Sequence, residues 1–141
     1  MIEGIDVEGR CSCGAVHMTV RGHLVAMAEC WCDDCQKETG GGSTRSVIVA
    51  SEHVEMSGRD IGEHRRASDR GSQVVRRFCR SCGDVMMADV EDMPFSAVRL
   101  GAPDNRSFFR PQMVLFTKSA PAWAPFPEGA QLFETQPAAA D

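Results

Sequence analysis

Short runs in which apolar and polar residues alternate recur along the chain. Residues 16–20 read VHMTV, and an alternation with a period of two predicts a strand with one buried face. Further strands are expected at residues 45–50, 53–56, 73–78, 85–90, 97–100 and 113–117. Glycine-containing turns such as Arg21-Gly22 and Ser57-Gly58 separate several of these runs. Short strands at regular spacing favour a mainly β fold of the sandwich or open-barrel kind.

One segment departs from this alternation. Residues 33–39 predict a short helix, with Asp33 as the N-cap and Gly40 as the left-handed residue that ends it. The pattern therefore predicts a mainly β fold with one or two short helices at most.

The C-terminal part of the sequence is rich in proline. Residues 121–127 carry three prolines, too many for the interior of a strand. We expect this stretch to lie across the sheet as an extended strap, with Trp123 and Phe126 buried. No linker or repeat interrupts residues 1–134, which we predict to form a single β domain. A disordered tail is expected at residues 135–141.

Composition and charge narrow the function classes. The 141 residues are 43% hydrophobic and 25% charged, which is typical of a globular domain. The net charge of −5 argues against a nucleic-acid partner. The first residues form no basic and then apolar leader, and no apolar run approaches the ~20 residues that cross a bilayer. We therefore expect a cytoplasmic protein without a membrane partner.

Seven cysteines fall into three closely spaced groups. They form a C-x-C pair, a C-x-C-x-x-C triplet and a C-x-x-C pair: Cys11 and Cys13; Cys30, Cys32 and Cys35; Cys79 and Cys82. In a reducing compartment, an odd number of cysteines at fixed close spacings is typical of metal ligands rather than disulfides. Zinc prefers four tetrahedral ligands, and two cysteines on one turn supply two of them.

Counting ligands predicts one closed and one open zinc site. The C-x-x-C pair followed by Gly83 is typical of a zinc knuckle, which supplies two ligands and needs two more. Cys11 and Cys13 are the remaining pair, so we expect them to join Cys79 and Cys82 around a structural zinc. The triplet then has three ligands and a vacant position, which is the composition of a catalytic zinc site. We expect two zinc ions per chain, with the second partly occupied.

Other interpretations of the cysteines stay open. Disulfides, an iron–sulfur cluster, and zinc at both sites without catalysis are each compatible with the sequence. The last defines a second function hypothesis, a non-catalytic zinc-binding module that contacts a protein or nucleic-acid partner. The arginine-rich stretch from Arg65 to Arg77 could supply that contact, although a solvated hairpin face is the more common role of such a stretch.

Three motifs resemble those of one known family. GRCSCGAV at residues 9–16, CWCDDC at 30–35 and FCRSCG at 78–83 are similar, in order and spacing, to the motifs of the glutathione-dependent formaldehyde-activating enzyme (GFA) family. The resemblance extends over residues 8–134, and it implies a zinc-binding Mss-four-like β-tent of antiparallel sheets. It also implies two sets of zinc ligands: Cys11, Cys13, Cys79 and Cys82 for the structural zinc, and Cys30, Cys32 and Cys35 for the active-site zinc.

The reaction that the resemblance implies is the addition of glutathione's thiol to formaldehyde, or the reverse. We therefore expect a carbon–sulfur lyase, an enzyme like S-(hydroxymethyl)glutathione synthase. Its substrates would be a small thiol such as glutathione and an aldehyde. The loop Gly40-Gly41-Gly42 could hold the carboxylates of glutathione on its amides, and a flexible loop is an equal alternative.

The chain departs from the family pattern at two positions. Trp31 and Val114 stand where many members have histidine, so any role of those histidines is absent here. Trp31 offers an apolar wall or a core residue instead. Met86 and Met87 adjoin in an expected strand, so one of them faces away from the core, and a homodimer is a further expectation.

Overall fold

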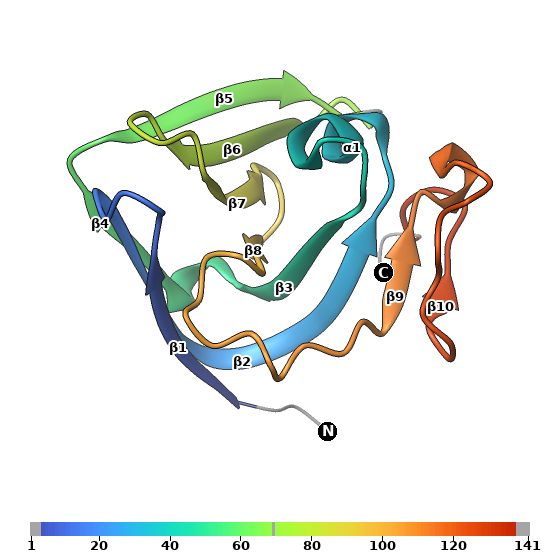
Figure 1. The fold of residues 1–141 in the computed structure, drawn as a ribbon, viewed down its shortest axis with the longest axis horizontal. Coiled ribbons are helices and arrows are strands. Elements are labelled where there is room, and N and C mark those ends of the chain that lie inside the picture. Colours follow the sequence, from blue (N-terminus) through green and yellow to red (C-terminus); the bar gives the residue numbers. More distant parts are fainter. Residues whose placement is uncertain (1–3, 69, 138–141) are drawn as a thin grey trace. The chain divides into compact units, whose positions relative to one another are not determined.

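A computed structural model describes residues 4–68 and 70–137, and it confirms a mainly β fold (Figure 1). The strands are β1 (Gly4–Arg10), β2 (Val16–Cys30), β3 (Thr44–Ala50), β4 (Val54–Gly58), β5 (Ile61–Ala67), β6 (Gln73–Cys79), β7 (Val85–Val90), β8 (Phe95–Arg99), β9 (Met113–Leu115) and β10 (Gln131–Leu132). Within the described residues, α1 (Asp33–Thr39) is the one α-helix, and η1 (Ser51–His53) and η2 (Thr117–Ser119) are short 3-10 turns. No helix in this part of the chain is long and apolar enough to cross a membrane.

The alternating runs predicted most of the strands, and the exceptions have a physical reason. β3, β6 and β7 lie where they were expected, whereas β2 continues ten residues beyond the predicted end at Val20. It continues because β1 pairs with it through His23, so the expected turn at Arg21-Gly22 stays extended. β5 was missed because all but the first two of its residues are exposed, which leaves no apolar period to detect.

The chain forms two compact units. Unit 1 comprises residues 1–25 and 47–109, and unit 2 comprises residues 26–46 and 110–141. The single domain expected over residues 1–134 stays a prediction. Of the expected tail, residues 138–141 lie outside the described residues, and the carbonyl of Thr135 accepts a hydrogen bond from the amide of Phe116.

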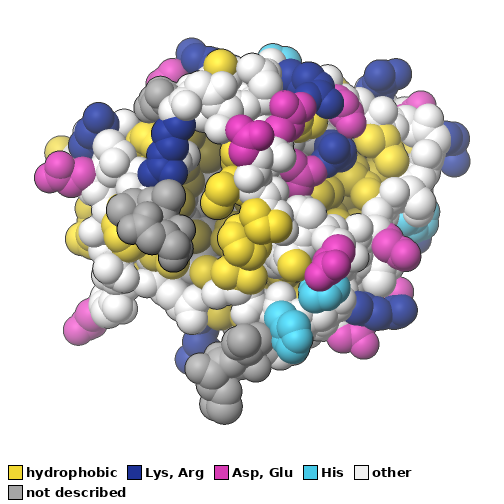
Figure 2. Space-filling view, turned by 180° about the vertical axis from the view of Figure 1, so that it is seen from behind, with side chains coloured by type: hydrophobic (Ala, Val, Ile, Leu, Met, Phe, Trp, Pro, Cys, Tyr) yellow, Lys and Arg dark blue, Asp and Glu magenta, His cyan; other side chains and the backbone are white. Residues whose placement is uncertain are grey.

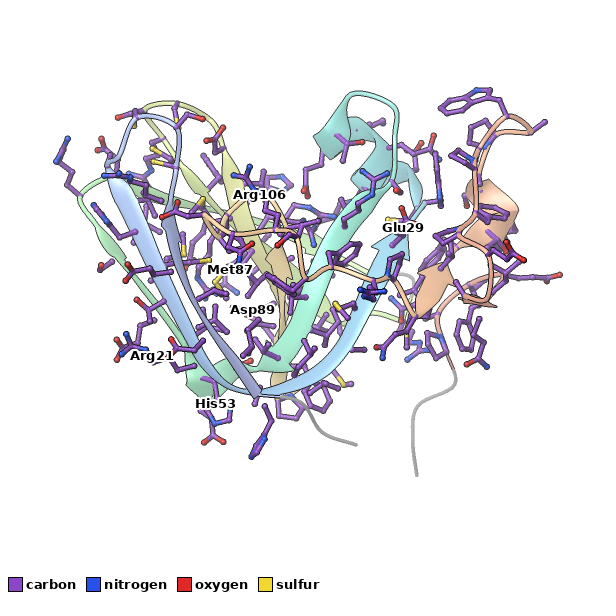
Figure 3. The ribbon with its side chains drawn as sticks, turned by 60° about the horizontal axis from the view of Figure 1, so that its bottom comes forward. Arg21, Glu29, His53, Met87, Asp89 and Arg106 are labelled. Atoms are coloured by element: carbon purple, nitrogen blue, oxygen red, sulfur yellow. The ribbon has the colours of Figure 1, made fainter. Side chains whose placement is uncertain are left out.

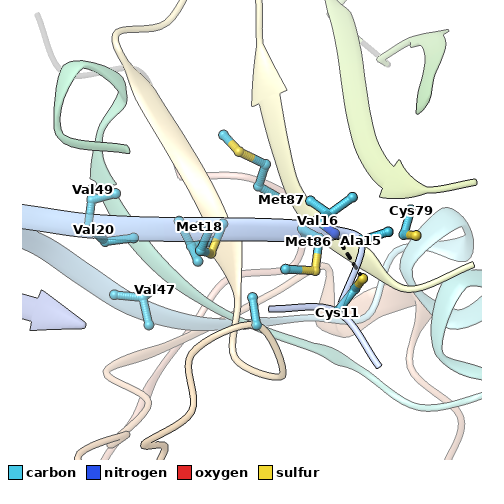
Figure 4. Packing of buried hydrophobic residues seen from close by; sticks show 12 residues of the cluster. Cys11, Ala15, Val16, Met18, Val20, Val47, Val49, Cys79, Met86 and Met87 are labelled. Atoms are coloured by element: carbon cyan, nitrogen blue, oxygen red, sulfur yellow. Dashed lines mark hydrogen bonds between the residues drawn. The ribbon is translucent and has the colours of Figure 1, made fainter. Parts of the chain in front are cut away.

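Unit 1 consists of antiparallel strands around one core. β1 and β4 both pair with the first part of β2, and β5, β6, β7 and β8 follow one another as an antiparallel meander. Alternate residues of β2 point inward, as the period of two predicted, and they pack with valines of β3 and both methionines of β7 (Figure 4). The core side chains include Val16, Met18, Val20, Val47, Val49, Met86 and Met87. Both methionines are buried, so neither is left to line an exposed contact.

Unit 2 is built on short parallel pairings. The end of β2 pairs with β9, and β9 pairs with β10, both in parallel. Trp31 and Val114 are buried in this unit, so both serve as core residues.

The expected strap at residues 121–127 is wrong in one respect. Trp123 is 69% exposed and Phe126 is 38% exposed, although both were expected to be buried. Trp123 lies in a turn closed by the amide of Ala124 on the carbonyl of Pro121 at 3.0 Å, and this turn directs its side chain outward. Trp123 still touches the core, because its ring packs edge-on against Trp31 with 5.8 Å between centroids.

Helix α1 begins and ends as the sequence predicted, but its N-cap is different. The sulfur of Cys32, not the carboxylate of Asp33, accepts the amide N–H of Cys35. Asp33 is already the first helical residue, so it lies one position too late to cap. Gly40 ends the helix in the left-handed conformation (φ 80°), as expected.

Candidate metal centres

The first cysteine cluster lies in unit 1. The sulfur atoms of Cys11, Cys13, Cys79 and Cys82 all lie within 4.8 Å of one another. Cys13 Sγ is 3.7 Å from Cys11 Sγ and 3.6 Å from Cys79 Sγ. Four sulfurs around a tetrahedral zinc at ~2.3 Å stand about 3.8 Å apart. The donor set therefore fits one zinc ion with four thiolate ligands.

Two similar turns present these sulfurs. Gly14 (φ 80°) donates its amide to the carbonyl of Cys11 at 3.1 Å, and Gly83 (φ 85°) donates to the carbonyl of Cys79 at 2.8 Å. Because glycine adopts a positive φ without strain, each turn reverses tightly and leaves its two thiols on the same side. The knuckle glycine predicted at Gly83 thus has a counterpart at Gly14.

A carboxylate ties the two turns together. Asp84 Oδ2 accepts the backbone amide of Ser12 at 2.7 Å and also the hydroxyl of Ser12. The hydroxyl, and then the amide, lower the pKa of Asp84. Ser12 lies between the first two cysteines and Asp84 follows the knuckle, so this contact holds the halves of the site in register. Sequence reasoning missed it, because no spacing rule relates two residues 72 positions apart.

The surroundings of the thiols in this cluster differ. Burial raises the pKa of Cys11, but the amide of Val16 and the thiol of Cys79 outweigh burial and lower the pKa to about 6. The amide of Ala15 lowers the pKa of Cys13, but desolvation and the neighbouring thiols raise it to about 12. The cluster therefore favours a first thiolate at Cys11, where an N–H group already points at the sulfur at 3.3 Å.

The second cluster lies in unit 2 and is local in the chain. The sulfurs of Cys30, at the end of β2, and of Cys32 and Cys35, at the start of α1, lie within 4.8 Å of one another. Cys35 is buried, whereas Cys30 and Cys32 are half-buried. The hydroxyl of Thr44 donates to Cys35 Sγ at 3.2 Å. The triplet expected from the spacing is thus brought together, separately from the first four cysteines.

The three crowded thiols of this triplet form a donor set that could hold a cation. Hydrogen bonds with Cys32 and Cys35, followed by burial, raise the pKa of Cys30. The pKa of Cys32 is also raised: its hydrogen bond with Cys30 lowers it, but Cys35 and burial outweigh that bond. Three neighbouring thiolates repel one another, so the set can ionise fully only with a positive partner. A dication with thiolate preference, such as zinc, fits this donor set.

A buried acid next to the triplet was not predicted. Glu29, which is labelled in Figure 3, is only 4% exposed. Its Oε1 accepts hydrogen bonds from the hydroxyl of Ser43 at 3.2 Å and from Nε of Arg45 at 3.0 Å. Its Oε2 has no hydrogen-bond partner among the described residues. Because side chains of a strand alternate, Glu29 and Cys30 point to opposite faces of β2. Glu29 therefore stabilises β2 on the face opposite to the one that carries Cys30.

The glycine loop after α1 uses its amides within the chain. Gly41 donates to the carbonyl of Gln36 at 2.7 Å, and Gly42 donates to the hydroxyl of Thr39 at 2.9 Å. An added Cβ would meet no atom within 4 Å at Gly40 or Gly41, so the loop is open on its outer side. The contact of Gly40, Gly41 and Gly42 with glutathione stays a prediction.

The arginine-rich stretch forms the hairpin of β5 and β6. Arg65 pairs with Glu63 and Glu91, and Arg77 pairs with Glu63 and Asp89. In the face drawn in Figure 2, basic side chains likewise lie next to acidic ones. Because carboxylates offset these arginines, the hairpin does not offer a uniformly basic surface, and its contact with a partner stays a prediction.

Comparison with known proteins agrees with this picture. The profile of a family described as glutathione-dependent formaldehyde-activating enzyme matches residues 6–119, which include all seven cysteines. The chain is also similar to the crystal structure of a Rhodobacter sphaeroides protein, with 18% identity and a TM-score of 0.55 over 70% of this chain and 88% of that chain. At this identity the likeness shows the fold alone. No curated protein matches the chain.

Proposed function

This chain belongs to the glutathione-dependent formaldehyde-activating enzyme family, and we propose that it makes or breaks the carbon–sulfur bond of an adduct between a small thiol, such as glutathione, and an aldehyde. The observation that carries the proposal is the second cysteine cluster. A protein that needed zinc only for its fold would be served by the four-thiolate cluster. Three further thiols converge elsewhere in the chain, and their number leaves a tetrahedral ion one position short.

The two clusters are assigned different tasks. Cys11, Cys13, Cys79 and Cys82 would hold a structural zinc, and the triplet would hold the zinc at the active site. When bound to three thiolates, zinc supplies a Lewis acid that keeps a coordinating thiol deprotonated near neutral pH.

The residues around the triplet determine how a substrate reaches it. Cys35 is the buried residue of α1, so a ligand approaches on the side of the half-buried Cys30 and Cys32. Trp31 lies between these two residues, and its burial against Trp123 fixes the backbone that presents both sulfurs. Because the ligands are already held in place, they need not rearrange when the substrate binds, and binding loses less conformational entropy.

Metal content and exchange kinetics test the proposal together. We expect two zinc ions per chain. We also expect the protein to exchange free aldehyde with its glutathione adduct faster than the uncatalysed reaction does, as measured by exchange NMR spectroscopy. Cys32→Ser should lose one zinc and lower the exchange rate by at least about 100-fold, because a ligand of the reacting site is gone. Lys37→Gln, on the exposed side of the same helix, is the control and should retain both properties.

One zinc per chain in zinc-replete protein, or an unchanged rate in Cys32→Ser, would contradict the proposal. Titration with glutathione gives a second readout, since backbone shifts should be confined to the region of residues 30–43. Two zinc ions without any such shifts would favour the alternative, a zinc-binding module for a macromolecular partner.

A further inference from the structure

Thr44, the first residue of β3, is almost fully buried, and its hydroxyl donates to the sulfur of Cys35 at 3.2 Å. We propose that Thr44 is a positioning residue of the three-thiolate site, and that its hydrogen bond makes Cys35 a weaker electron donor to the metal than a bare thiolate. The inference rests on the proposed function only in that the triplet must bind a metal. It concerns a residue outside all three cysteine motifs.

The strand holds Thr44 from its other face. The neighbours Ser43 and Arg45 alternate to the opposite side, where both bond to Oε1 of the buried Glu29. These two contacts anchor the start of β3 on each side of Thr44. A buried hydroxyl needs an acceptor, and the hydroxyl of Thr44 has one in the sulfur of Cys35.

The three thiols consequently differ in their hydrogen bonds. Cys35 accepts a hydroxyl, and Cys32 accepts the amide of Cys35 at 3.4 Å. Among the described residues, no hydroxyl or amide is seen to donate to Cys30. A donor draws charge from a thiolate, so the ion receives less charge from Cys35 and acts as a stronger Lewis acid toward a fourth ligand.

Cobalt substitution tests this directly, because sulfur-to-cobalt charge-transfer bands report the charge on the thiolates. Thr44→Val keeps the shape of the side chain and removes the hydroxyl, so its bands should shift to lower energy. Thr44→Ser should restore the wild-type position. The matched control is Thr117→Val, which loses a hydroxyl bond of the same length, 3.2 Å, to a backbone carbonyl of the same unit and should leave the bands unchanged.

An unshifted spectrum in Thr44→Val would overturn the proposal, as would an equal shift in the control. Thr44→Val could fail to bind cobalt at the triplet. In that case, cobalt binding by Thr44→Ser would still support the role of the hydroxyl, and a failure of Thr44→Ser to bind cobalt would refute the proposal. The outcome is separate from catalysis. A band shift in Thr44→Val, together with no glutathione–aldehyde exchange by the wild type, would support the role of Thr44 and refute the proposed function. Exchange by the wild type, together with no band shift in Thr44→Val, would support the proposed function and refute the role of Thr44.

Discussion

The two cysteine clusters are built in opposite ways. The four-thiolate cluster joins turns that are 66 residues apart at Cys13 and Cys79, and a carboxylate latch between Ser12 and Asp84 keeps them together. The triplet is local: six residues, from Cys30 to Cys35, contain all its sulfurs, and one hydroxyl from β3 supports it. The long-range cluster closes a fold, whereas the local cluster only needs a helix to form. Loss of metal should therefore damage the two units to very different degrees.

The largest expected effect comes from breaking the long-range cluster. Cys79→Ser should lower the free energy of unfolding by several kcal/mol, up to on the order of 10, because structural zinc binding contributes directly to folding. Cys30→Ser should change it by no more than about 1 kcal/mol. Thermal unfolding of both variants in zinc-replete buffer, with metal analysis, measures the difference. Equal destabilisation would remove the distinction between the clusters.

Backbone closeness beside the four-thiolate cluster gives the next effect. Gly9 lies two residues before Cys11, and an added Cβ would stand 1.8 Å from the carbonyl oxygen of Ala102. Since backbone cannot move aside cheaply, Gly9→Ala should cost about 3 kcal/mol in urea unfolding. Gly101→Ala is the control, because its Cβ would meet no atom within 4 Å. If Gly9→Ala left the free energy of unfolding unchanged, β1 would be able to move away from the backbone at Ala102 without cost.

The latch should contribute less. Asp84→Asn should lower the free energy of unfolding by about 1 kcal/mol, since two hydrogen bonds to a half-buried carboxylate weaken. The pKa of Asp84 is lowered in the folded protein, so this contribution is present above the unfolded value of about 3.9 and is lost as the pH falls through the lower folded value. A double-mutant cycle with Ser12→Ala measures the coupling, and strict additivity would exclude the latch.

The smallest effect is expected at the exposed aromatic residue of unit 2. Trp123→Ala should cost about 0.5–1 kcal/mol, because it removes one edge-on contact with Trp31. Phe126→Ala serves as a comparison. Calorimetry should show a loss at least as large for this variant, because Phe126 is only 38% exposed and its truncation uncovers more apolar area. A large loss from Trp123→Ala would mean that this ring supports the triplet more than its exposure suggests.

The parts of the fold that could be predicted are those with a local signal. Cysteine spacing identified both clusters, and Gly40 marked the end of the helix, although its N-cap lies one residue earlier than predicted. Contacts between distant residues carry no such signal. Nothing in the sequence relates Ser12 to Asp84, or shows that Glu29 and Arg45 meet.

The prediction for Trp123 and Phe126 failed for a related reason. Hydrophobicity predicts that both are buried, but both are exposed, and Trp123 lies in a turn closed by a backbone hydrogen bond. Likewise, the N-cap at Cys32 could not be expected from capping preferences, because a thiol is an uncommon cap and here a metal-ligand motif places it.

The exposure of Cys13 determines where oxidation of the four-thiolate cluster would begin. With zinc bound, all four sulfurs would be thiolates, and peroxide would reach them most readily at Cys13, because Cys11 and Cys79 are buried and Cys82 is half-buried. A sulfenic acid at Cys13 would leave a bound zinc with three ligands and would remove the sulfur that connects the turn between β1 and β2 to Cys79 at the end of β6. Oxidation would then first destabilise unit 1. Storage with a reductant would therefore preserve the fold of this unit, and its effect on activity would be secondary.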